Sequence, residues 1–480
     1  MKFISKKIKW GVILSFLVGI IGLFYTIFLQ PSKKDYKKLQ EILVEYKEAK
    51  VNNEVEILPG GIPFYLKNKI NEFEKLIESV ETSPFIRLSG DACFQISNFY
   101  YDLGDYKKAN TFINKALEKN QNEPKYIANR IKINFYRNCL VDLEKDFQKI
   151  KNSIKDDEKI ELLSIISSTK YITGNIEECL HYSEETLNLV EKVNKIKDME
   201  YYYISSKYNL FISNFLKGDF KLADNHFVNI NEYIEKLKSS KDLNQILNQK
   251  IFMALYSLIF GDTKNFENQI DEWLKLYKNS KKFNPLIEDY IKFFSLFFKP
   301  INISEMKEFD DLCIVLENKE NIFIKKQLTY LFLMRMLNKN NSIKNSEIQN
   351  LIDRADLRRM EAIDVYSKAG EYYFNEKEFE KSIIFLNRVI MNLKDTSLNY
   401  MYMQTFLRIG QVEYSINNFF NAKSSLLKSK HFLQTLILNN IKNKFVNKEI
   451  IKTIENLILI NDEISKQIKA IEKIEAIFNE

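Results

Sequence analysis

The stretch FYYDLGDYKKANTFINKAL, residues 99–117, decides how this chain folds. Gly104 and Asp105 separate two segments in which apolar residues recur at helical spacing. Glycine permits a tight turn, and Ala109 is small enough to let two helices approach closely where they cross. The stretch therefore predicts two short antiparallel helices joined by a turn.

The same signature recurs along the chain. It is found in ITGNIEEC (172–179), LKGDFKLAD (216–224), FGDTKNF (260–266), SKAGEYYFNEKEFEKS (367–382) and LRIGQVEYSINNFFNAK (407–423). The residues that define it are Gly104, Ala109, Gly174, Gly218, Ala223, Gly261, Gly370, Gly410 and Ala422. With the turn as phase marker, the turns fall at 104, 138, 174, 218, 261, about 299, about 338, 377 and 417. This spacing of 34 to 44 residues predicts about nine units over residues 88–435.

The pattern resembles the tetratricopeptide repeat, a pair of antiparallel helices about 34 residues long. The resemblance implies an all-α, right-handed superhelical solenoid whose stacked units share one core. It also implies a concave groove, lined by the first helix of each unit, that binds protein or peptide partners. The low content of Gly and Pro, 12 and 7 of 480 residues, agrees with helix nearly throughout.

Residues 10–29 form an unbroken run of twenty uncharged, mostly apolar residues. At about 1.5 Å per residue such a run crosses the ~30 Å hydrocarbon core, and it ends without a small-residue cleavage site. It predicts a transmembrane anchor within residues 1–30, with a removed signal as the alternative. Eight lysines and one aspartate in residues 1–38 account for the whole formal charge of +7. The remainder is neutral, which argues against a nucleic-acid partner.

The flanks of the anchor bear on topology. Four lysines before the span favour a single-pass membrane protein with a cytoplasmic N-terminus and the solenoid on the far side. Four lysines between 33 and 38 favour a cytosol-facing body instead. Residues 31–87 are expected to form a helical stalk that breaks at 59–63. Residues 436–480 are expected to cap the last repeat as one helix, or else to form a coiled-coil homodimer.

Six of the nine units carry an aromatic residue three positions before the turn. These residues are Tyr101, Phe135, Tyr171, Phe215, Phe374 and Tyr414. On the first helices they form a candidate partner-binding groove, because each ring offers a large contact area at a low entropy cost. Packing between repeats is the competing interpretation. Asn98 and Asn129 match asparagines with which some family members bind a terminal carboxylate, but Phe94 and Glu161 stand where basic residues are needed.

The sequence carries no recognisable constellation for catalysis, a cofactor or a metal. His181, His226 and His431 lack ligand spacing, there is no phosphate-binding motif, and the four cysteines are expected to be buried thiols. The resulting prediction is a non-enzymatic, membrane-tethered scaffold for protein–protein interaction. One alternative is a receptor or assembly factor for protein import or envelope assembly. Another is an enzyme with a site in 275–350, a stretch flanked and occupied by Arg335, Arg354, Arg358 and Arg359.

Overall fold

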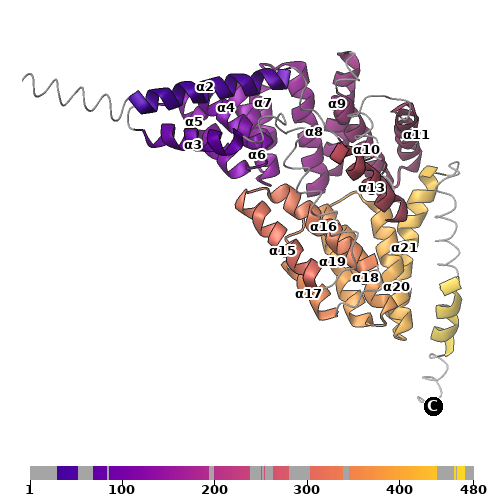
Figure 1. Cartoon of the computed structure of the whole chain (residues 1–480). Coiled ribbons are helices and arrows are strands. Elements are labelled where there is room, and N and C mark those ends of the chain that lie inside the picture. Colours follow the sequence, from indigo (N-terminus) through magenta and orange to yellow (C-terminus); the bar gives the residue numbers. More distant parts are fainter. Residues whose placement is uncertain are drawn as a thin grey trace, which may run out of the picture. The chain divides into compact units, whose positions relative to one another are not determined.

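The computed structural model describes residues 30–51, 69–83, 86–193, 199–237, 250, 253, 263–279, 303–338, 345–440, 459–460 and 462–470. All regular secondary structure in these residues is helical (Figure 1), so the predicted all-α class is confirmed for this part of the chain. Within the same residues, no helix is both long and apolar enough to cross a membrane. The predicted anchor at 10–29 and the predicted turn at Gly261 lie outside the described residues.

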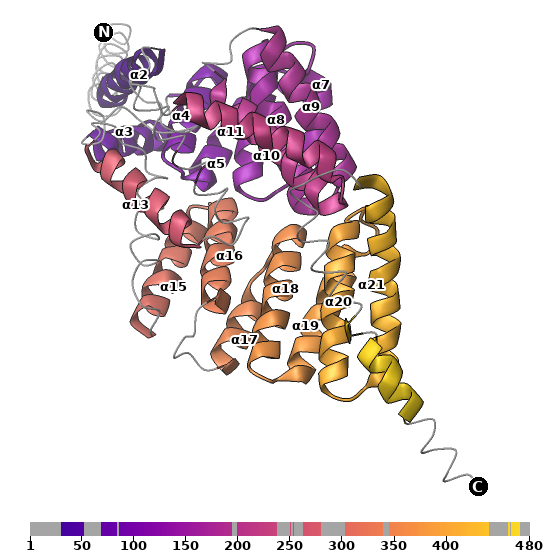
Figure 2. The same ribbon diagram turned by 90° about the vertical axis from the view of Figure 1, so that its right-hand side faces the viewer.

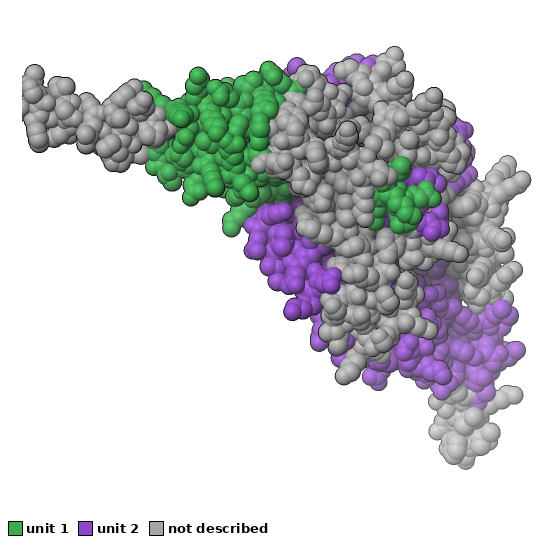
Figure 3. Space-filling view, in the orientation of Figure 1, with its two compact units in different colours: residues 1–133, 271–292 green, residues 134–270, 293–480 purple. Residues whose placement is uncertain are grey.

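The chain divides into two compact units, Met1–Ile133 with Asp271–Lys292, and Asn134–Ile270 with Phe293–Glu480 (Figure 3). Unit 1 contains α2 (Gln30–Val51), α3 (Ile70–Thr82), α4 (Gly90–Asp102) and α5 (Tyr106–Lys119). Unit 2 contains α7 (Leu143–Ile150), α8 (Asp156–Thr173), α9 (Ile176–Lys192), α10 (Glu200–Lys217), α11 (Phe220–Leu237), α15 (Ile303–Asn318), α16 (Ile322–Asn338), α17 (Asn345–Arg354), α18 (Arg359–Asn375), α19 (Phe379–Leu393), α20 (Asn399–Ser415) and α21 (Phe419–Asn440). Two helices, α6 (Pro124–Tyr136) and α13 (Thr263–Asn279), cross the boundary between the units.

In unit 1, the segment expected to be a stalk holds a packed helix pair. Leu39 and Leu43 of α2 are buried, and the Phe73 ring of α3 lies 4.0 Å from the Phe99 ring of α4. Tyr46 of α2 meets the same Phe99 ring edge-on at 5.6 Å. Leucine and tyrosine recur on α2 at helical spacing among many charged residues, so the helix has a core-facing stripe. The pair α2–α3 therefore shares a core with α4.

In unit 1, ion pairs join residues that are one repeat length apart in the sequence. Lys108 lies 2.7 Å from Glu74, and Lys125 lies 2.8 Å from Asp91. The two partners are 34 residues apart in both cases. Exposed pairs of this kind contribute only about 0–1 kcal/mol each, so they indicate the stacking register more than they stabilise it.

One type of turn joins the two helices of a pair. At Gly174 the backbone N–H donates to the carbonyl of Tyr171 at 2.9 Å, and the next N–H donates to the carbonyl of Lys170 at 2.8 Å. This Schellman motif needs a residue with positive φ, which the chain supplies with glycine or with other residues. In the described residues it occurs at positions 104, 138, 174, 218, 320, 377 and 417.

The sequence predicts six of these seven positions. The seventh, position 320, lies in the weakly repeating stretch. There the motif is at Glu320, with φ of 52°, so that α15 and α16 form the pair. The turn expected near 338 falls where α16 ends, at Asn338, and residues 339–344 lie outside the described residues. The turn expected near 299 lies outside the described residues.

Unit 2 brings together helices that are far apart in sequence. One apolar cluster joins Phe211 of α10 and Ala223 of α11 to Ile363 of α18 and Val389 of α19. A second cluster joins Phe220 of α11 to helices α20 and α21. The helices α18, α19, α20 and α21 themselves lie side by side in chain order (Figure 2).

The C-terminal segment packs on the last helix pair. Ile464 and Ile468 are buried in the same cluster as Leu433 and Leu436 of α21. Because these isoleucines are already covered within one chain, the arrangement favours a capping helix over a coiled-coil homodimer. Residues 441–458 of the expected single helix lie outside the described residues.

Candidate partner-binding surface

The six aromatic residues of the predicted groove lie in the last turn of their first helices. Tyr101 belongs to unit 1 and the other five belong to unit 2. Tyr101 and Phe135 are buried, with 8% and 6% of their surface exposed. The remaining four are half-buried, namely Tyr171, Phe215, Phe374 and Tyr414.

Four of these rings pack across the turn against the ring five residues later. The centroid distances are 5.5 Å for Tyr101–Tyr106, 5.6 Å for Phe215–Phe220, 5.8 Å for Phe374–Phe379 and 5.7 Å for Tyr414–Phe419. Edge-on and tilted pairs at such distances contribute about 0.5–1.5 kcal/mol beyond the area they bury. Packing within the repeat therefore uses one side of each ring.

Two rings of unit 2 also contact later parts of the same chain. Phe135 lies 4.5 Å from Phe323 of α16, and Phe215 lies 5.1 Å from Tyr400 of α20. The face on which they lie is thus not a continuous open groove for a partner. The repeat pattern in the sequence predicts contacts between successive repeats, but it gives no information on contacts between distant repeats.

Phe374 and Tyr414, which we call the terminal rings, belong to the helix pairs α18–α19 and α20–α21. Both are half-buried, and their ring contacts among the described residues are with Phe379 and Phe419 of their own repeats. A half-buried ring still offers apolar area to a ligand, as contact residues of protein interfaces do.

The residues that match a carboxylate clamp have structural roles. Asn129 is 4% exposed, and its amide donates to the Ser97 hydroxyl at 3.1 Å. Ser97 in turn donates to the carbonyl of Ala109 of its own repeat at 2.8 Å, so the bond between Asn129 and Ser97 joins two neighbouring repeats. The amide of Asn129 is therefore occupied, and the position does not serve a terminal carboxylate. Asn98 accepts a bond at 3.4 Å through its backbone carbonyl from the Tyr46 hydroxyl.

Small residues mark close helix crossings, as their pattern predicts. A Cβ on Gly370 would lie 2.7 Å from Leu386 Cγ, and one on Gly410 would lie 2.7 Å from Leu426 Cγ. The three pattern alanines are almost fully buried, namely Ala109, Ala223 and Ala422. These residues position the helices and offer no chemistry.

The arginines that prompted the enzyme hypothesis are engaged in structural contacts. Arg354 lies 3.0 Å from Asp310, and the Arg359 Nε donates to the carbonyl of Asn392 at 2.8 Å. Arg358 pairs with Glu361 and lies 4.5 Å above the Phe323 ring. In the part of the chain that the structure describes, no group of His, Cys, Asp and Glu residues is arranged to hold a metal ion.

The cysteines behave mostly as expected. Cys93, Cys179 and Cys313 are buried, and burial raises the pKa of each thiol, to about 11 for Cys313. Cys139 is exposed, contrary to the prediction, because it directly follows the turn at Asn138. All four are free thiols.

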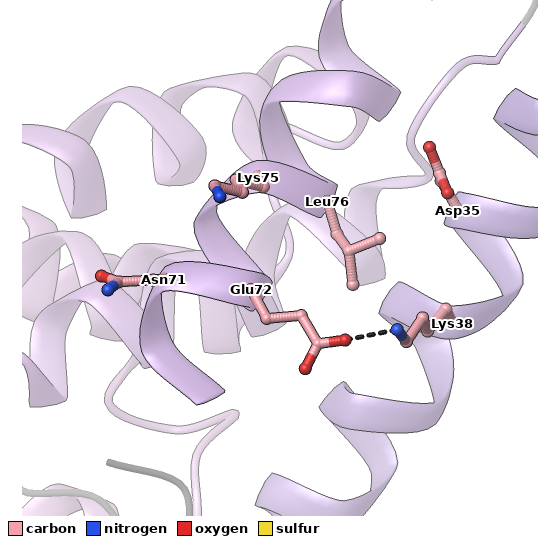
Figure 4. A pocket seen from close by; sticks show the side chains of 6 residues that line it. All are labelled: Asp35, Lys38, Asn71, Glu72, Lys75 and Leu76. Carbon is pink, nitrogen blue, oxygen red and sulfur yellow. Dashed lines mark ion pairs between the residues drawn. The ribbon is translucent and has the colours of Figure 1, made fainter. Parts of the chain in front are cut away.

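A pocket between α2 and α3 is lined by Asp35, Lys38, Asn71, Glu72, Lys75 and Leu76 (Figure 4). Its charged groups are mostly matched to one another. Lys38 pairs with Glu72, and the Ser79 hydroxyl donates to Asp35 at 2.6 Å. Such a surface has no convergent reactive groups, so we do not regard it as a catalytic site.

Comparison with known proteins agrees with an arrangement of repeated helix pairs. Residues 90–122 match a family model described as tetratricopeptide repeat, which covers α4 and α5. The match is confined to this helix pair, and the neighbouring helix pairs use the same type of turn. No curated protein sequence matches the chain.

Two solved structures are similar at low sequence identity. One is entitled "Crystal structure of APC/C hetero-tetramer Cut9-Hcn1", with 12% identity, a TM-score of 0.40, and coverage of 84% of this chain and 82% of that one. The other is the yeast protein Tom70, with 14% identity, a TM-score of 0.27, and coverage of 81% and 95%.

Proposed function

We propose that this protein is a membrane-tethered scaffold that binds a protein or peptide partner through its helical repeats. The observation that carries the proposal is that the terminal rings, Phe374 and Tyr414, are half-buried and keep part of their surface accessible. A residue that only packs inside the repeat needs no solvent-accessible surface, whereas a residue that contacts a partner needs some. The tetratricopeptide match at 90–122 supports a role in protein binding.

Tethering rests on the apolar run at 10–29 and the lysines around it. An anchored scaffold holds a weakly bound partner near the bilayer, because confinement raises the effective concentration. We place the N-terminus in the cytoplasm and the repeats on the far side. A receptor or assembly factor with a cytosolic body is the outcome to be distinguished from this one.

The binding test uses the variant Phe374→Ser/Tyr414→Ser in the full chain. Cross-linking followed by affinity capture should recover fewer of the proteins that the unmodified chain retains, while the melting temperature falls only slightly. The matched control is Phe420→Ser, which removes a ring that is 62% exposed on a second helix. We expect the control to keep the full set of partners.

Two results would count against the groove. If the double variant unfolds, as expected for buried rings whose loss costs about 3–5 kcal/mol, the terminal rings are packing residues. If it folds and retains every partner, they are not contacts.

Anchoring is tested by deleting residues 1–30. The shortened chain should move to the soluble fraction with nearly the same far-ultraviolet circular dichroism, because the deletion removes no described core residue. Retention on membranes after washing with high salt and carbonate would contradict a single anchor. Protease accessibility of the intact chain in sealed vesicles decides on which side the repeats lie.

A further inference from the structure

A half-buried carboxylate lies near tyrosine residues of three other helices in unit 2. Asp364 of α18 has Tyr171 of α8, Tyr208 of α10 and Tyr330 of α16 close enough to interact with its charge. The Tyr330 hydroxyl donates to Asp364 Oδ2 at 3.3 Å. All four residues are half-buried, so each keeps part of its surface accessible to solvent. Four helices from distant parts of the sequence thus supply one polar cluster.

In the described part of the chain, the carboxylate of Asp364 has no cation paired with it. Among the described residues, Asp364 makes its one hydrogen bond with Tyr330 and forms no ion pair. The neighbouring acid, Glu361, is already paired with Arg358 of the same helix. Burial, with Glu361 adding to it, raises the pKa of Asp364 to about 7, although the Tyr330 hydroxyl acts in the opposite direction. An ionised carboxylate in such a place is costly unless a cation accompanies it.

We propose that Asp364, together with the rings of Tyr171, Tyr208 and Tyr330, forms a binding site for an organic cation that carries an ammonium or guanidinium group. The carboxylate supplies the opposite charge, and tyrosine faces attract cations through their ring quadrupoles. A metal ion fits less well, because the described part of the chain has no group of three or more His, Cys, Asp and Glu residues that could hold one.

The cation has two possible sources with the same chemistry. It is either a free small molecule or an arginine or lysine side chain of a protein partner, and only the second source rests on the proposed scaffold function. Both require the ionised form of Asp364. Binding should therefore weaken about tenfold from pH 8 to pH 6, because a carboxyl with a pKa of about 7 is ionised in only about a tenth of the molecules at pH 6.

The experiment titrates the full chain, in a nonionic detergent, with N-acetylarginine methyl ester by calorimetry. The probe's neutral isostere, N-acetylcitrulline methyl ester, serves as the ligand control. A parallel arm uses a peptide with one arginine flanked by alanines. We expect saturable binding of the arginine compound, the peptide or both at pH 8, and none of the citrulline compound.

Asp364→Asn should weaken this binding at least tenfold, because the amide keeps the size and the acceptor for Tyr330 but loses the charge. Asp311→Asn is the matched control, since Asp311 is an exposed aspartate on α15 of the same unit. It should bind like the unmodified chain. Circular dichroism melting shows whether each variant is folded.

The outcomes separate the possibilities. Binding of the free compound points to a small-molecule ligand, and binding of the peptide alone points to a partner side chain. Equal affinity in Asp364→Asn, or no saturable binding of either cation to the unmodified chain, would overturn the proposal. A normal cation site in a chain that captures no partner would leave this site standing and count against the scaffold function alone.

Discussion

Replacing Gly218 by alanine tests the contact between the end of α10 and α21. Gly218 has a φ of 91°, and this left-handed conformation costs other residues about 1–2 kcal/mol. A Cβ at this position would also overlap the Cδ2 methyl of Leu436, which is 1% exposed and has little room to move. Overpacking of this kind costs about 1–3 kcal/mol. We expect Gly218→Ala to lower the free energy of unfolding by about 2–5 kcal/mol.

Urea unfolding followed by circular dichroism measures the change, and a second variant separates its two causes. Leu436→Ala alone opens a cavity and costs about 2–5 kcal/mol. If the new methyl and Leu436 collide, the double variant is more stable than the sum predicts, by about 1–3 kcal/mol. Strict additivity would refute the contact between α10 and α21. An unchanged midpoint for Gly218→Ala would refute the left-handed turn as well.

Three further expectations concern other parts of the chain. Ala109→Leu should destabilise by about 1–3 kcal/mol at a fully buried helix crossing, whereas Lys107→Leu on the exposed side of α5 should not, and equal melting temperatures would contradict the crossing. Burial, assisted by Lys207, lowers the pKa of His226 to about 4. Because this pKa is below the unfolded value of about 6.5, the stability that neutral His226 contributes is fully present above pH 6.5 and is lost as pH falls towards 4. His226→Gln should flatten that part of the stability–pH curve, and an unaltered curve would show that the histidine is not desolvated. Cys139 should react with a maleimide in the native chain while the three buried cysteines react only in urea, a difference that mass spectrometry detects.

The sequence was most informative where a local conformation demanded a particular residue. A left-handed turn favours glycine, so Gly174 and Gly218 marked their turns directly. Asn417 was found because its flanking residues matched the pattern. Glu320 takes the same conformation without glycine and with weak flanking signals, so its turn was missed.

The candidate sites were less accessible to sequence reasoning, because they depend on contacts between distant repeats. Phe215 meets Tyr400, and Tyr171 lies near Asp364, only because α8 and α10 pack near α18 and α20. Small rotations between successive helix pairs decide such contacts, and periodicity alone does not encode them. From the sequence alone, Asp364 would be interpreted as an ordinary surface charge on a helix with many charged residues.

The helix α2 has a consequence for how far the protein can reach. It begins at Gln30, immediately after the apolar run at 10–29, and its side chains are packed in unit 1 from Leu39 onward. A flexible linker lets a tethered domain sweep a volume whose radius grows with the square root of its length. This chain has no such linker after the predicted span. If the span is embedded, α2 holds unit 1 close to the lipid, because this helix begins directly after the span.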